Sequence, residues 1–131
     1  MKLIKSLFAI ALFFAMNTIS AQSITDKWKE MHDYHELLSK TFHPAEEGNF
    51  GPIKSSSEDL VAKAELLDVE KMPQDLRTPK VDETISVLKR QTKLVSELVT
   101  RKAPDAEIMR AFQNLHDVFH RIVEICQPGK K

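Results

Sequence analysis

Two short segments of the chain each carry a pair of histidines at helical spacing. His32 and His35 lie in "MHDYH", and His116 and His120 lie in "LHDVFH". Residues three or four apart share one face of an α-helix, so each pair presents two imidazoles side by side. Neutral imidazole nitrogen is a good ligand for zinc, copper and nickel. The two pairs therefore predict the two halves of a divalent transition-metal site.

The two halves can meet only if the first and last helices are neighbours. In an antiparallel up-down-up-down four-helix bundle, these two helices lie side by side and run in opposite directions. If the start of the first helix is level with Cys126, then His32 lies opposite His120, and His35 lies within a turn of His116. We therefore expect His32, His35, His116 and His120 to be metal ligands at one level of the bundle.

His43 and Glu47 are further candidate ligands. They lie at the start of a glycine-rich segment, "HPAEEGNFGPIK", which is typical of a loop. If this loop folds back, they would complete the histidine site. Otherwise they could form a second, weaker site.

The positioning elements follow from apolar residues that recur at helical spacing in four segments. The first helix is predicted to stop close to Phe42, because Pro44 disfavours helical geometry in the residue before it. Ser55 and Glu58 resemble a capping box that starts the second helix. That helix is predicted to end before Pro73.

The third and fourth helices have clear start signals. Thr78-Pro79 places a hydroxyl at the N-cap and a proline in the first turn. Ala103-Pro104-Asp105 breaks the chain and restarts it with an acidic first turn. The last helix is predicted to end at Pro128-Gly129. These features predict an all-α protein, an antiparallel up-down-up-down four-helix bundle that follows a cleaved signal peptide.

Residues 1–22 have the pattern of a secretory signal peptide, which leaves residues 23–131 as one four-helix bundle domain. Lys2 and Lys5 precede an apolar run that is too short to span a bilayer, so we expect no membrane anchor. The protein is therefore expected to be exported, to the periplasm or the extracellular space. The whole chain has 19 basic and 19 acidic residues, which gives no reason to expect a nucleic-acid partner.

Cys126 is the single cysteine, so the chain cannot build an internal disulfide framework. A free thiol near the end of an exported chain could pair with another chain. That pairing would give a homodimer or a complex with a partner protein.

The predicted architecture resembles the small exported metal-binding and cytochrome b562-like four-helix bundles of bacterial envelopes. The resemblance rests on the signal peptide, the helix count and the segments "MHDYH", "FHPAEEGN" and "LHDVFH". It implies a second candidate cofactor, haem b. The axial ligands would be His35 with His116, or Met31 with a histidine of the last helix, such as His120.

Three functions are consistent with these residues. The first is metal buffering, delivery or sensing, because four protein ligands leave no open position for a substrate. The second is electron transfer by haem b. The third is a non-catalytic structural or interaction module whose histidines pack in the core. We expect no enzyme activity, because the sequence has no HExxH motif, no phosphate-binding loop and no nucleophile beside a base.

Overall fold

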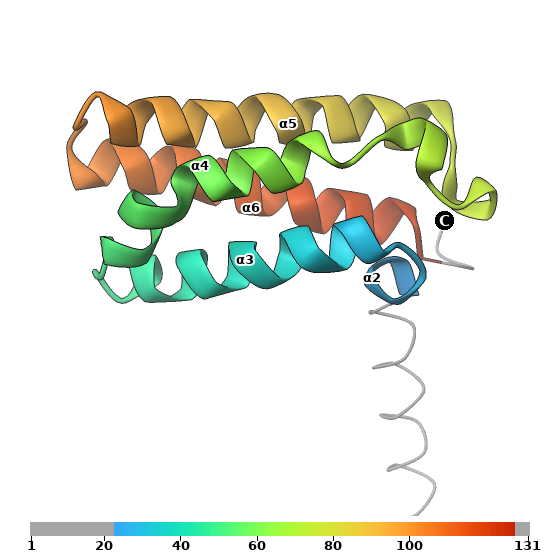
Figure 1. Cartoon of the computed structure of the whole chain (residues 1–131), viewed down its shortest axis with the longest axis horizontal. Helices are drawn as coiled ribbons and strands as arrows, with labels where there is room; N and C mark the ends of the chain where they lie inside the picture. The colour runs from blue at the N-terminus through green and yellow to red at the C-terminus, as the bar shows by residue number, and fades with distance from the viewer. Residues whose placement is uncertain (1–22, 128–131) are drawn as a thin grey trace, which may run out of the picture.

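The computed structural model describes residues 23–127 and is all-helical, with no strand among those residues. Four long helices and a short one account for most of the chain (Figure 1). The long helices are α3 (Lys29–Glu46), α4 (Gly51–Glu65), α5 (Pro79–Thr100) and α6 (Asp105–Ile125). The all-helical prediction with four long helices is confirmed. The predicted signal peptide and the Pro128-Gly129 stop lie outside the described residues.

The four long helices pack around one apolar core. Helices α4 and α6 each contact both α3 and α5 (Figure 1). Each helix contributes fully buried side chains, including Leu38, Leu60, Leu88 and Leu115. Helices α3 and α6, which carry all five histidines, are therefore direct neighbours.

Two of the predicted helix starts are confirmed. Helix α5 begins at Pro79, and the Thr78 Oγ1 atom accepts a hydrogen bond of 3.1 Å from the Val81 backbone N–H. Helix α6 begins at Asp105, directly after Pro104. In both cases a proline or a hydroxyl at the helix start satisfies or removes a backbone donor that would otherwise lack a partner.

The predicted end of the first helix is wrong, because α3 continues through Pro44 to Glu46. Proline lacks the N–H that would bond to the preceding turn, but one lost bond near a helix end is tolerated when the face is buried. Phe42 and Ala45 are both buried on that face. The chain turns away after Glu46 through Gly48 (φ 90°), and the backbone N–H groups of Gly48 and Asn49 donate to the carbonyls of Ala45 and Pro44.

The predicted start of the second helix is also wrong. Helix α4 begins at Gly51 with Pro52 in its first turn, so the connection to α3 is much shorter than the expected loop. Ser55 lies inside the helix, where its hydroxyl donates to the Gly51 carbonyl at 3.1 Å. Burial of Ile53 explains why the helix includes this turn.

Several elements were not predicted. A short helix, α2 (Ser23–Lys27), precedes α3 and is separated from it by the extended residue Trp28. Helix α4 ends at Glu65, well before Pro73, and two 3-10 turns, η1 (Val69–Lys71) and η2 (Gln74–Leu76), lead to α5. Met72, directly after η1, and Leu76 of η2 are buried and hold this segment against the core.

Within residues 23–127, no helix combines the length and the apolar character that crossing a bilayer requires.

Candidate metal centre

Helices α3 and α6 meet through a layer of phenyl and imidazole rings. Phe42 of α3 contacts Phe112 of α6 edge to face, with ring centroids 5.1 Å apart. His35 of α3 stacks flat on Phe119 of α6, with centroids 4.7 Å apart and planes within 1°. His116 of α6 stacks flat on Phe42, at 4.1 Å and 6°. Each helix thus places one imidazole on a phenyl ring of the other.

This pairing tests the predicted level of the two histidine segments. His35 was expected within a turn of His116, and it lies against Phe119, about one turn from His116 along α6. His116 stacks on Phe42, two turns beyond His35 on α3, so the two helices meet through these segments, while the pairing of His32 with His120 stays a prediction.

His116 and His120 form the closest imidazole pair of the interface. Their Nε2 atoms are 3.3 Å apart, and their ring planes are inclined at 77°. The spacing of four residues along α6 brings the two rings to the same side of the helix. At this distance one neutral ring can donate a hydrogen bond to the other, or both nitrogens can face a shared cation.

His35 is half-buried, and its Nε2 atom lies 3.3 Å from the Ser39 hydroxyl one turn along α3. Burial lowers the pKa of His35 below its ordinary value, and the positive charges of His120, His32 and His43 lower it further. The ring is therefore neutral at neutral pH. These three histidines lie close enough to His35 to influence its charge.

Burial also lowers the pKa of His116, and the charge of His120 adds to this effect. Glu46 and Asp117 act in the opposite direction, and His43 lowers the pKa slightly. Five histidines are carried by the two neighbouring helices, with His32, His35 and His43 on α3 and His116 and His120 on α6. We call them the histidine cluster.

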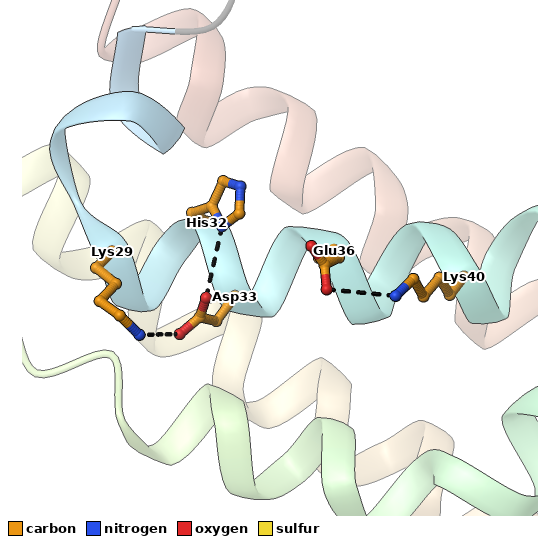
Figure 2. Close-up of polar contacts among 5 residues, drawn as sticks. All are labelled: Lys29, His32, Asp33, Glu36 and Lys40. Carbon is orange, nitrogen blue, oxygen red and sulfur yellow. Dashed lines mark hydrogen bonds and ion pairs between the residues drawn. The ribbon is translucent and has the colours of Figure 1, made fainter.

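His32 and His43 lie at the exposed edge of the histidine cluster. The His32 Nδ1 atom is 3.5 Å from an Asp33 carboxylate oxygen, and the other Asp33 oxygen forms an ion pair with Lys29 at 2.8 Å (Figure 2). The His43 Nδ1 atom lies 3.3 Å from Glu46. Both histidine side chains are more than half exposed, at 54% and 70%.

The described side chains provide a pair of candidate ligands rather than a complete set. Within residues 23–127, no three or more His, Cys, Asp and Glu side chains lie in an arrangement that could hold a metal ion. His116 and His120 are together, whereas His32 and His35 have other contacts. Glu47 is exposed at the C-cap of α3, beyond Glu46. The four-histidine site, with or without His43 and Glu47, remains a prediction.

Sequence reasoning missed the partners of the buried imidazoles. It did not foresee that Phe42 and Phe119 stack on His116 and His35. A signal was present, since Phe42 follows His35 by two helical turns and Phe119 lies between His116 and His120. Phenyl rings at those positions share the face of the histidines.

No protein-family model, curated protein or solved structure matches this chain.

Proposed function

We propose that this protein is an exported, up-down-up-down four-helix bundle that binds a divalent transition metal, zinc, copper or nickel, through His116 and His120. The observation that carries the proposal is the 3.3 Å separation of their Nε2 atoms. Two nitrogens that each lie about 2.05 Å from a tetrahedral zinc are about 3.3 Å apart. The pair therefore already has the spacing that a metal chelate requires.

The surroundings of His116 favour metal binding. A metal binds only the neutral imidazole, so a lowered pKa keeps the ligand available in mildly acidic solution. The stacking on Phe42 also fixes the plane of the ring before the metal arrives. A ligand that is already oriented loses less side-chain entropy on binding.

The proposed role is buffering, delivery or sensing of the metal, and not catalysis. The rings of His116 and His120 contact each other and the phenyl rings of Phe42 and Phe119, which suits holding an ion between them. Export depends on the predicted signal peptide in residues 1–22. The bundle topology is supported by the contacts of α3 with both α4 and α6.

Haem b fits the described side chains poorly. His35 and His116 are the predicted axial ligands, and each has a phenyl ring stacked against its face. Met31 is fully buried. A porphyrin would have to displace Phe42 and Phe119 from the core to reach these ligands. Absorption spectroscopy tests this alternative directly, because only a bound porphyrin gives a Soret band.

A structural role is the second candidate, and the stacking geometry favours it. His35 and His116 cover the outer faces of Phe119 and Phe42, so they could serve as polar caps on an aromatic core. The contact of His116 with His120 would then be a hydrogen bond between neutral rings. This role requires no metal.

Calorimetric titration with zinc, nickel and copper separates the two roles. The protein is purified without a histidine tag, and the variants are His120→Gln and His43→Gln. His120 is one of the two proposed ligands, and His43 is a matched control, an exposed histidine beside a carboxylate. Metal binding should be lost in His120→Gln and kept in His43→Gln. Equal binding by both variants, or no heat of binding in the unmodified protein, would refute the proposed function.

A further inference from the structure

We propose that two copies of this chain share one metal ion, with His116 and His120 of each copy as its four ligands. The inference rests on the proposed function, which it completes by naming the source of the missing ligands. It identifies the partner as a second copy of the same chain.

The first argument is the number of ligands. A closed zinc site has four protein ligands. Within the described chain, His116 and His120 are two imidazoles whose ring nitrogens approach at the spacing of a chelate, and no group of three or more metal-binding side chains forms there. Half of the coordination sphere must therefore come from elsewhere.

The second argument is that the histidines of α3 are held by other contacts. His35 lies flat on Phe119, and its Nε2 atom faces the Ser39 hydroxyl. His32 and His43 lie beside carboxylates of their own helix. Moving His35 to the metal would break its stacking contact with Phe119.

The third argument is access and symmetry. His120 is exposed, so the pair can be reached from outside the bundle. A two-fold axis through the ion places His116 and His120 of a second copy on the side of the ion that the first copy leaves uncoordinated. Two-fold symmetry is the usual geometry of a homodimer. Removal of the predicted signal peptide takes away Lys2 and Lys5 and leaves 17 basic against 19 acidic residues, and this small net charge of −2 adds little repulsion between two copies.

The test measures mass and stoichiometry together. The full chain, without a histidine tag and with a reductant that keeps Cys126 a thiol, is titrated with zinc chloride. Analytical ultracentrifugation should show a monomer without zinc and a doubled mass at half an equivalent of zinc. Calorimetry should give one zinc for two chains, and EDTA should restore the monomer.

Variants identify the ligands. His120→Gln leaves the stacking of His116 on Phe42 in place, so it should fold normally and lose zinc-dependent dimerisation. His43→Gln should dimerise like the unmodified protein. One zinc per chain without a change in mass would overturn the shared site and leave the proposed function standing. Absence of zinc binding would overturn both, and a dimer indifferent to zinc and EDTA would overturn the shared site alone.

Discussion

The hydrogen bond between Tyr34 and Thr92 joins α3 to α5 inside the core, and its direction can be worked out. The Tyr34 hydroxyl lies 2.8 Å from Thr92 Oγ1, and both side chains are at most 1% exposed. The Thr92 hydroxyl donates to the Leu88 carbonyl at 2.7 Å. Because its one proton is used there, Thr92 accepts and Tyr34 donates. Burial raises the pKa of Tyr34, so the phenol keeps its proton.

This direction predicts unequal effects of two conservative substitutions. Tyr34→Phe removes the donor and leaves Thr92 bonded to Leu88, so the free energy of unfolding should fall by about 1 kcal/mol. Thr92→Val keeps the side-chain shape and leaves the Tyr34 hydroxyl buried without an acceptor, which costs about 1–3 kcal/mol. The double variant should be more stable than Thr92→Val alone, because neither partner is then left unpaired.

Urea denaturation, monitored by circular dichroism, gives the free energy of unfolding of the unmodified protein, the two single variants and the double variant. In a domain of this size, each kcal/mol also lowers Tm by roughly 4–8 °C, so thermal melting gives an independent check. Threonine and valine have similar helix propensity, so the comparison isolates the hydroxyl. The reasoning fails if Tyr34→Phe is at least as destabilising as Thr92→Val, or if the two losses simply add in the double variant.

Three further predictions concern pH, helix capping and the thiol. The folded-state pKa values of His35 and His116 lie below 6.5, so the unfolded chain binds more protons as the pH falls through 6.5. The metal-free protein should therefore lose stability below pH 6.5 and be most stable above it, and chemical denaturation at several pH values checks the sign. Thr78→Ala should cost about 1 kcal/mol of unfolding free energy through loss of the α5 cap, whereas Thr100→Ala, at the other end of α5, should cost less. Burial raises the pKa of Cys126 to about 11, so Ellman's reagent should react with the native protein far more slowly than with the urea-unfolded chain at pH 8.

The fold could be predicted best where a local rule and the core agree. The structure has helix starts at Thr78-Pro79 and Pro104-Asp105, as the sequence predicted. Local rules failed where burial opposed them. Pro44 lies inside α3 because Phe42 and Ala45 remain on the buried face beyond it.

The contact between the first and last long helices was predictable, whereas the side-chain directions of the candidate site were not. Helical spacing indicated that the two histidine segments would meet between these helices, and His35 does lie against α6 within about one turn of His116. It could not decide between a ring that faces its neighbours and one that stacks on a phenyl ring, because that choice depends on rotamers set by the packing of both helices. His35 turns to Phe119 and Ser39, and His120 turns to His116.

The stacking of His35 on Phe119 and of His116 on Phe42 links the first long helix to the last. Neither contact can form until α6 has been synthesised, because its partner is missing from any shorter chain. Contacts so distant in sequence require the closure of a long loop, which slows folding. The histidine cluster is therefore a product of the completed chain, and translation intermediates that end before α6 lack it.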